Sequence, residues 1–168
     1  MAAVTLGAAS IASAELGTIA ASADVDRVAL RVSPPFESIA DPTERATVEL
    51  TDLVNQERNR RGLPNLLPHA QVAAAAMAHS GDMAARAMAV HFGVDGADTG
   101  DRLAREGFTS MVWGELIGAG YQTPQQLFDV WIVNEVHRAH LLSDNVYVGV
   151  GVAATAEGVP YWTLVVAT

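Results

Sequence analysis

The sequence predicts an α+β fold in which helices cover a mainly antiparallel sheet. Segments with helix signals dominate residues 41–135, whereas residues 145–168 consist largely of β-branched and aromatic runs. Because the expected strands come late and do not alternate regularly with helices, this order favours a helix-covered sheet over a doubly wound parallel one. The chain has 168 residues, of which 50% are hydrophobic. It is therefore long enough for one compact domain with its own core.

The first expected helix has clear signals at both ends. It opens with Asp-Pro-Thr-Glu, in which Asp41 can cap the helix and Glu44 completes a capping box. The helix is expected to run to about Arg61, because Gly62 provides a C-terminal stop.

Three further helices are expected. The second begins near Pro68 and carries an alanine-rich run, whose small side chains allow another element to pack closely. The third covers residues 99–106 and is stopped by Gly107. The fourth opens with a Thr-Pro-Gln-Gln capping box at 123–126 and ends near Glu135. The sequence therefore predicts about four helices.

The strand signals gather toward the end of the chain. Residues 145–155 and 159–168 are rich in valine and aromatic side chains, and Ala-Glu-Gly separates them. This pattern predicts an antiparallel hairpin. The segment 111–120, MVWGELIGAG, is expected to supply another strand.

The residues before the first helix predict two different regions. Residues 1–23 are small and apolar and contain Ala-Ser-Ala twice, as in a secretory signal, although the first basic residue is Arg27. The alternative is a disordered alanine-rich leader. Residues 24–40 contain Ser-Pro-Pro and are interpreted as a linker. The folded domain is therefore expected at 41–168, in a secreted or cell-envelope protein.

Composition argues against several classes of function. The formal net charge is −9, and all 10 basic residues are arginines. The densest basic group, Arg58, Arg60 and Arg61, is too short to follow a phosphate backbone, so nucleic-acid binding is not expected. The absence of cysteine excludes disulfides, thiolate metal sites and cysteine nucleophiles. No segment after the leader reaches the length of a membrane span.

The five histidines follow none of the common catalytic signatures. The sequence has no His-Glu-x-x-His, no glycine-rich phosphate loop and no Gly-x-Ser-x-Gly. His79 and Asp82 lie three residues apart on the second expected helix and are interpreted as a surface pair. His91 precedes an acidic, glycine-containing stretch and, taken alone, is interpreted as a loop histidine.

Ionisable residues also interrupt two apolar segments. Glu115 lies in MVWGELIGAG, where a carboxylate must be paired, hydrogen-bonded or facing a cleft. Glu115 could equally be a structural acid whose partners lie in the interior or a residue of a functional site. In WIVNEVHRAHLL, His137 and His140 share a face if the segment is helical. If the helix ends near Glu135, one of these two histidines has only a packing role. Arg138 is expected to form an ion pair or to bind carbonyls.

Taken together, these segments resemble the CAP superfamily of cysteine-rich secretory, antigen and pathogenesis-related proteins, in particular its short bacterial, cysteine-free branch. The resemblance covers about residues 44–168. It rests on the order and spacing of LVNQERNRRGLPNLLPHAQVAAAAMAHSGDMAAR, VHFGVDGADTGDRLAREGF, WGELIGAG, WIVNEVHRAHLL, VYVGVGVA and YWTLVVA. It implies a three-layer α-β-α sandwich.

The resemblance also implies a central cleft, which in the family is lined by two histidines and two glutamates. Its motifs place the histidines at His91 and His137 and the first glutamate at Glu115. Asn134 takes the usual place of the second glutamate, and Glu135 follows one residue later, rotated by about 100° if the segment is helical. Two histidines with a nearby carboxylate can bind a divalent ion, so His91 and His137 are the expected ligands of zinc.

Three functions are compatible with such a cleft. We rank first a secreted or cell-envelope module that binds a small apolar ligand, such as a lipid or sterol, or a peptide. A structural envelope protein with a buried polar network ranks second. A metal-dependent hydrolase or peptidase ranks third, because no nucleophile is present and Glu115 would have to serve as both metal ligand and base. Leu116 replaces the asparagine that the family prefers, which removes a polar contact beside the site. No catalytic residue is assigned.

Overall fold

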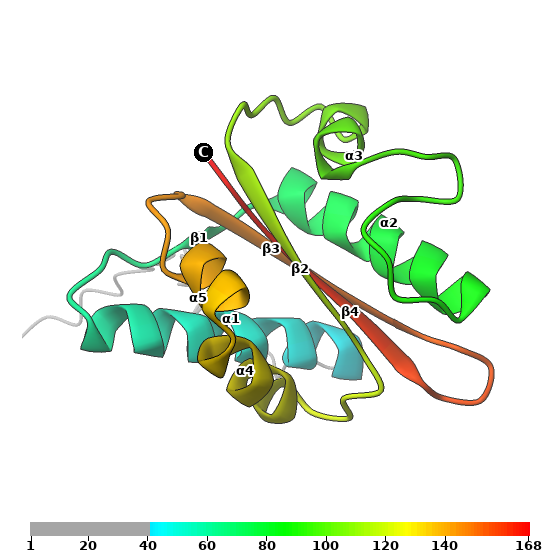
Figure 1. Cartoon of the computed structure of the whole chain (residues 1–168), viewed down its shortest axis with the longest axis horizontal. Helices are drawn as coiled ribbons and strands as arrows, with labels where there is room; N and C mark the ends of the chain where they lie inside the picture. Colours follow the sequence, from blue (N-terminus) through cyan, green and yellow to red (C-terminus); the bar gives the residue numbers. More distant parts are fainter. Residues whose placement is uncertain (1–40) are drawn as a thin grey trace, which may run out of the picture. The chain divides into compact units, whose positions relative to one another are not determined.

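Residues 41–168, described by a computed structural model, form a three-layer α-β-α sandwich (Figure 1). One face of the sheet is covered by α1 (Pro42–Arg60), α4 (Pro124–Val133) and α5 (Glu135–Leu141), and the other by α2 (Ala70–Arg86) and α3 (Thr99–Arg105). The predicted fold class is confirmed. The predicted leader, 1–23, and linker, 24–40, lie outside the described residues.

The sheet has four strands in the described part of the chain. They are β1 (Leu67–Pro68), β2 (Trp113–Ala119), β3 (Tyr147–Ala154) and β4 (Pro160–Ala167), in the order β1-β3-β4-β2. The predicted hairpin is confirmed as the antiparallel pair β3–β4, and β2 adds to β4 antiparallel. The two-residue strand β1, which was not predicted, pairs with β3 in parallel. Because β2 lies at one edge of the sheet, residues at its start can contribute to a surface site.

The helix signals read from the sequence act as expected in α1. The Asp41 carboxylate accepts a hydrogen bond from the backbone N–H of Thr43 at 2.8 Å. Beyond the other end, Gly62 adopts φ +72°, a left-handed conformation that glycine enters without a Cβ penalty. Among residues 41–168, no helix combines the length and the apolar character needed to cross a bilayer.

The fourth helix, α4, ends at Val133, close to its expected end near Glu135, but a separate helix that was not predicted, α5, begins at Glu135. The Asn134 side chain accepts hydrogen bonds from the backbone N–H groups of Val136 and His137, at 3.0 and 3.2 Å. It thereby caps α5 directly after α4 has ended. Arg138 donates to the carbonyl oxygens at the end of α4, including that of Ile132 at 3.3 Å, which agrees with its expected carbonyl-binding role. The described chain therefore has five helices rather than four.

Successive residues of β2 face opposite layers, as the strand period requires. Leu116 is fully buried in the cluster formed with α1 and α4. Glu115 points to the other side, toward α2 and α3. Leu116 therefore does not lie beside Glu115 on the site-bearing face, so the expected loss of a polar contact there does not apply.

The alanine-rich helix α2 packs unusually close to β3. A Cβ atom added to Gly149 would lie 2.2 Å from the backbone nitrogen of Ala73, and one added to Gly151 would lie 2.4 Å from that of Met77. Glycines on the strand and alanines on the helix thus permit near backbone-to-backbone contact. This close approach brings the next turn of α2, which carries His79, over the sheet beside Glu115.

Candidate functional site

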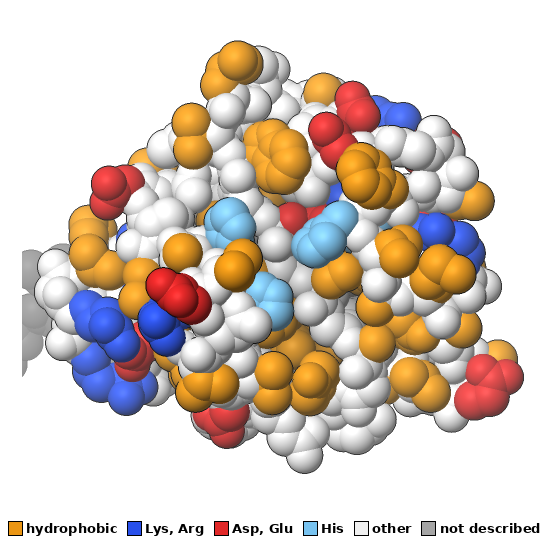
Figure 2. Space-filling view, viewed as in Figure 1, with side chains coloured by type: hydrophobic (Ala, Val, Ile, Leu, Met, Phe, Trp, Pro, Cys, Tyr) orange, Lys and Arg blue, Asp and Glu red, His pale blue; other side chains and the backbone are white. Residues whose placement is uncertain are grey.

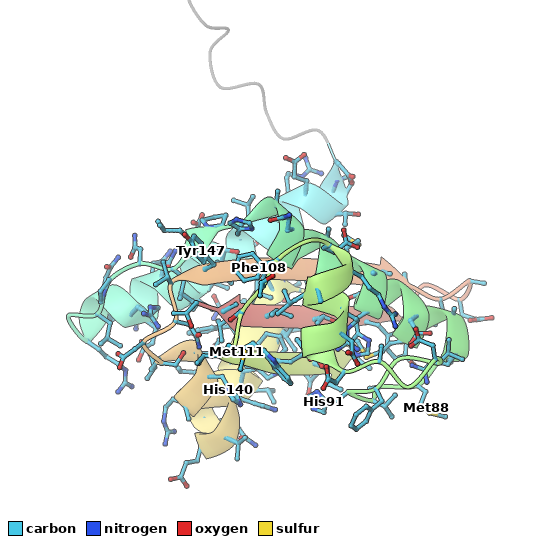
Figure 3. The ribbon with its side chains drawn as sticks, turned by 90° about the horizontal axis from the view of Figure 1, so that it is seen from above. Met88, His91, Phe108, Met111, His140 and Tyr147 are labelled. Carbon is cyan, nitrogen blue, oxygen red and sulfur yellow. The ribbon has the colours of Figure 1, made fainter. Side chains whose placement is uncertain are left out.

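A cleft with a volume of about 360 Å³ opens beside the edge strand β2. Its walls come from the loop after α2, the N-terminal end of α3, the start of β2, and α5. Its titratable lining residues are His91, Asp98, Glu115, His137 and His140. Figure 2 shows histidine side chains on either side of a hollow in this face, with hydrophobic side chains around it. Figure 3 shows His91 and His140 at the same edge of the ribbon.

The structure brings together three of the five residues that the sequence nominated for a site. His91, Glu115 and His137 line the same cleft. Asn134 and Glu135 do not line it, because the Asn134 side chain caps α5 and Glu135 is exposed in the first turn of that helix. The separate helix α5, rather than a continuation of α4, accounts for this placement.

His140 also lines the cleft, although the sequence indicated only a structural role for it. It lies against Gly114 of β2, where an added Cβ would come within 2.3 Å of the His140 Nδ1 atom. Glycine at this position therefore allows α5 to approach the edge strand. His137 and His140 project from the same helix, as their spacing of three residues requires.

Glu115 forms the centre of a buried polar network. Its Oε1 atom lies 2.8 Å from Nδ1 of His91, and its Oε2 atom accepts a hydrogen bond from Nη2 of Arg102 at 2.5 Å. The Arg102 guanidinium also donates to the carbonyl oxygen of Ala97 at 2.8 Å. The Glu115 side chain is only 2% exposed. Glu115 is therefore a paired interior acid that also forms part of the cleft floor.

His79 belongs to this network, and the prediction that it forms a surface pair with Asp82 is wrong. The His79 side chain is fully buried, and its Nε2–H donates to the carbonyl oxygen of Val90 at 2.9 Å. The same nitrogen lies 3.7 Å from Oε1 of Glu115. Asp82 instead pairs with Arg86, one turn later on the same helix.

Sequence reasoning missed His79 and Arg102 for different reasons. The buried positions of α2 recur at helical spacing and include Val72, Ala76, His79 and Met83. That spacing was available in the sequence and could have placed His79 on the inner face. Arg102 gave no comparable signal, because its partner, Glu115, lies on another element and the pairing depends on how α3 packs against β2.

The expected zinc ligands, His91 and His137, have no third ligand beside them among the described residues. Among residues 41–168, no group of three or more His, Asp or Glu side chains is placed to hold a metal ion. Both oxygens of Glu115 are already engaged, by His91 and Arg102. A carboxylate neutralised by an arginine is a poor additional ligand for a cation. Zinc binding by His91 and His137 alone stays a prediction.

Residues 51–166 match the family described as CAP, the cysteine-rich secretory protein family. The chain belongs to the CAP family. Among curated proteins, the uncharacterised protein YkwD of Bacillus subtilis is 31% identical over 109 residues, which are 64% of this chain and 41% of YkwD. The match therefore spans about two fifths of that relative's length.

Solved structures agree with the CAP assignment. An extracellular protein of Bacillus anthracis with an SCP domain shares 28% identity and a TM-score of 0.65, covering 74% of this chain and 41% of that one. A cysteine-rich secretory protein of Staphylococcus aureus gives 20% identity and a TM-score of 0.62, covering 76% and 40%. An outer surface protein of Borrelia burgdorferi gives 13% identity and 0.67, covering 72% and 90%. The last two show likeness of fold alone.

Two histidines of the site are expected to make this CAP domain sensitive to acid. Burial lowers the pKa of His79, and the neighbouring Glu115 only partly opposes it. Burial also lowers the pKa of His137, with further lowering by His140 and His91. Below the ordinary histidine pKa of 6.5 the unfolded chain therefore binds more protons than the folded one. The free energy of unfolding should fall as the pH drops below that value.

Urea unfolding between pH 7.5 and pH 5 tests this acid sensitivity. The variants His79→Leu and His137→Gln should each show a flatter dependence on pH than the parent chain, because each removes one group that must stay neutral in the folded state. Equal slopes in the parent and both variants would contradict the assignment.

Proposed function

We propose that this CAP domain is an extracellular or cell-envelope binding module whose cleft takes a small ligand with an apolar body and an uncharged polar head, such as a sterol or fatty alcohol. One observation carries the proposal. Large apolar side chains stay exposed around the polar floor of the cleft, with Phe92 62%, Val136 66% and Trp113 37% exposed. Grouped exposed apolar side chains at a concave site are typical of ligand binding.

The dimensions and polarity of the cleft support a ligand of this kind. Its volume of about 360 Å³ lies within the range of small-molecule sites. Nδ1 of His137 is buried and has no hydrogen-bond partner among the described residues. Because burial lowers the pKa of His137, its imidazole is neutral at pH 7 and suits a hydroxyl better than an anion.

The proposed extracellular or cell-envelope location is inferred from the location of a similar protein. The neighbour from Bacillus anthracis, which is 28% identical, is described as an extracellular protein. We infer the same location for this chain. This chain covers only 41% of the Bacillus anthracis protein, so the inference concerns location alone.

A structural role in the envelope is the second candidate, favoured by the buried network itself. Glu115, Arg102 and His79 lie together in the interior, where they fasten β2 to α2 and α3. We rank binding first, because such a network does not explain the exposed apolar rim. Hydrolysis ranks third, because the Glu115 oxygens are engaged by His91 and Arg102 rather than free to activate water.

Titration with the fluorescent sterol dehydroergosterol tests the binding proposal, and cis-parinaric acid, whose head group is a charged carboxylate, should bind more weakly. Val136→Ser should weaken sterol binding about tenfold, since it removes an apolar side chain worth about 1.5 kcal/mol when buried. Val133→Ser is the matched control, because Val133 is also exposed, at 75%, but does not line the cleft. Failure of the parent chain to bind dehydroergosterol, tighter binding of cis-parinaric acid, or equal losses in the two variants would overturn the proposal. Uptake of an extended peptide in place of both probes would overturn the lipid-like ligand.

A further inference from the structure

Two loops beside the cleft, which we call the rim loops, carry large apolar side chains. The first comprises residues 88–94, after α2, and the second comprises residues 110–113, which lead into β2. Each gives the cleft one aromatic side chain, Phe92 in the first loop and Trp113 in the second. Neither rim loop contains Asp, Glu, Lys or Arg. The mouth of the cleft is thus bordered by two segments without acidic or strongly basic side chains.

The apolar surface of the rim loops extends beyond the cleft. Met88, Val94 and Met111 do not line the cleft, yet they are 53%, 76% and 94% exposed. Figure 3 shows Met88 and Met111 on the side of the ribbon where His91 and His140 mark the cleft. Large apolar side chains that stay in water together on one side of a protein mark an interaction surface.

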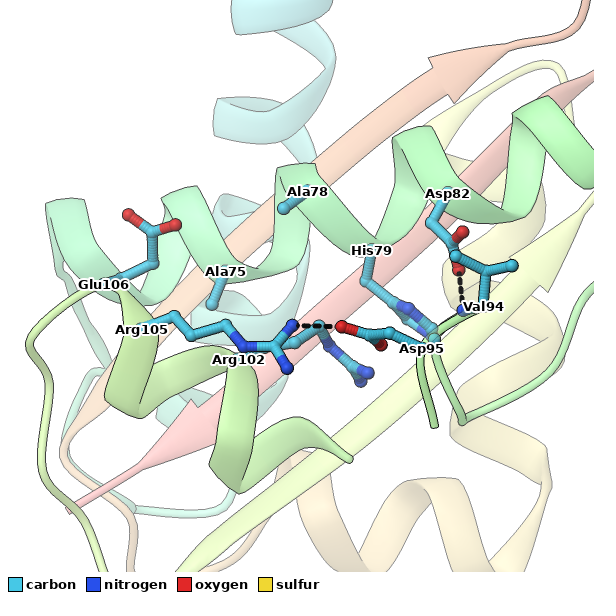
Figure 4. Close-up of a pocket in the computed structure, with 10 residues that line it drawn as sticks. Ala75, Ala78, His79, Asp82, Val94, Asp95, Arg102, Arg105 and Glu106 are labelled. Atoms are coloured by element: carbon cyan, nitrogen blue, oxygen red, sulfur yellow. Dashed lines mark hydrogen bonds and ion pairs between the residues drawn. The ribbon is translucent and has the colours of Figure 1, made fainter. Parts of the chain in front are cut away.

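The first rim loop is held in place through its backbone. Three successive carbonyl oxygens of this loop accept hydrogen bonds from side chains of α2 and α3. The donors are His79 to Val90 at 2.9 Å, Arg102 to His91 at 3.2 Å and Arg86 to Phe92 at 3.0 Å. The N–H of Val94 donates to the Asp82 carboxylate at 3.2 Å (Figure 4). Because these backbone groups already have partners, the loop can turn apolar side chains toward a nonpolar surface without leaving them unpaired.

The arginines of α2 and α3 around this loop each have an acidic partner. The pairs are Arg86–Asp82, Arg102–Glu115 and Arg105–Asp95, the last at 2.6 Å (Figure 4). None of these three cations is left to attract an anionic surface, and the whole chain has a formal net charge of −9. The rim loops therefore suit an uncharged apolar surface better than an anionic one.

We propose that the rim loops dock this CAP domain on an uncharged lipid bilayer, with Met88 and Met111 entering its interfacial region beside the mouth of the cleft. The choice of a bilayer rests on the proposed function, because a sterol or fatty alcohol resides in bilayers and must pass from there into the cleft. A protein partner seated on the rim loops would instead cover the mouth. Trp113 also suits this boundary, since tryptophan is enriched at membrane–water interfaces.

Flotation of the full chain with sterol-free phosphatidylcholine vesicles tests the docking. The chain should float with these vesicles, and added salt should change the binding by less than about twofold, because apolar contact rather than charge holds the surfaces together. Replacing part of the lipid with phosphatidylglycerol should not strengthen the binding. Absence of flotation, or binding that requires phosphatidylglycerol and is lost in salt, would overturn the proposal. Formation of a dimer in place of vesicle binding, seen by sedimentation, would also overturn it.

Two methionines outside the cleft locate the docking surface. Met88→Ser and Met111→Ser should each weaken vesicle binding about tenfold, because each replaces an apolar side chain that the bilayer would bury with a polar one. Met77→Ser is the matched control, since Met77 is an exposed methionine of α2 that lies outside the rim loops and does not line the cleft. Equal losses in the three variants would overturn the assignment.

Titration with dehydroergosterol separates this inference from the proposed function. Met88→Ser and Met111→Ser should bind the sterol in solution as tightly as the parent chain, because neither side chain lines the cleft. Weaker sterol binding in these variants would place the methionines in the cleft and contradict the inference. Sterol binding without flotation contradicts the docking alone, whereas flotation without sterol binding contradicts the proposed function alone.

Discussion

Replacing Arg102 with methionine is expected to lower the free energy of unfolding by about 3–5 kcal/mol. The substitution keeps much of the apolar stem but removes the cation that neutralises Glu115, whose side chain is only 2% exposed. Removing one partner of a buried ion pair leaves the other charge without compensation in a medium of low polarity. Urea unfolding at pH 7.5 measures the loss.

Two further variants separate this effect from a general disturbance of α3. Arg105→Met removes an arginine on the same helix whose ion pair with Asp95 is exposed, and it should cost less than about 1 kcal/mol. Combining Arg102→Met with Glu115→Gln should recover part of the stability, because the uncompensated charge is then gone. Equal losses in Arg102→Met and Arg105→Met, or no recovery in the double variant, would contradict the role assigned to the pair.

Replacing Arg58 with methionine is expected to cost about 3 kcal/mol. The Arg58 side chain is buried near the C-terminal end of α1 and donates to three carbonyl oxygens, those of Pro64, Leu141 and Ser143, at 2.8, 2.8 and 2.9 Å. Hydrogen bonds from a charged donor contribute about 1.5–3 kcal/mol each, and the carbonyls left behind lose a partner. Thermal or urea unfolding measures the loss.

The same variant should loosen α5, since two of the three carbonyls lie at its C-terminal end. Amide hydrogens of α5 are expected to exchange faster in Arg58→Met than in the parent chain. Arg60→Met is the matched control, because Arg60 lies on the same helix, is exposed and makes only a surface ion pair with Glu57. Equal free energies of unfolding in Arg58→Met and Arg60→Met would show that the buried hydrogen bonds of Arg58 do not stabilise the fold more than an exposed ion pair does.

Local signals explain why much of the fold could be predicted. Asp41 caps α1 and Gly62 follows its end, because capping and left-handed turns depend on neighbouring residues alone. The closing hairpin was visible for the same reason, as two β-branched runs flank a short turn. The helix after Asn134, α5, was missed because a residue that ends one helix and caps the next leaves no gap in the helical pattern.

The basic group at the end of α1 marks the limit of local reasoning. Arg58, Arg60 and Arg61 are alike in the sequence, yet only Arg58 is buried, because its position on the helix faces the end of α5. His79 shows the same limit in part. Its helical spacing could have placed it on the inner face, but nothing local indicated that Glu115 would lie 3.7 Å away.

The sequence by itself determined the CAP family, the layered fold and three residues that line the cleft, His91, Glu115 and His137. Only the tertiary structure decided that Arg102 neutralises Glu115, that His79 is buried beside it, and that both donors hold the first rim loop through its carbonyl oxygens. The physical reason is the range of the interactions. Caps, turns and periodicity act between neighbours, whereas a buried ion pair between different elements depends on how helices dock on the sheet.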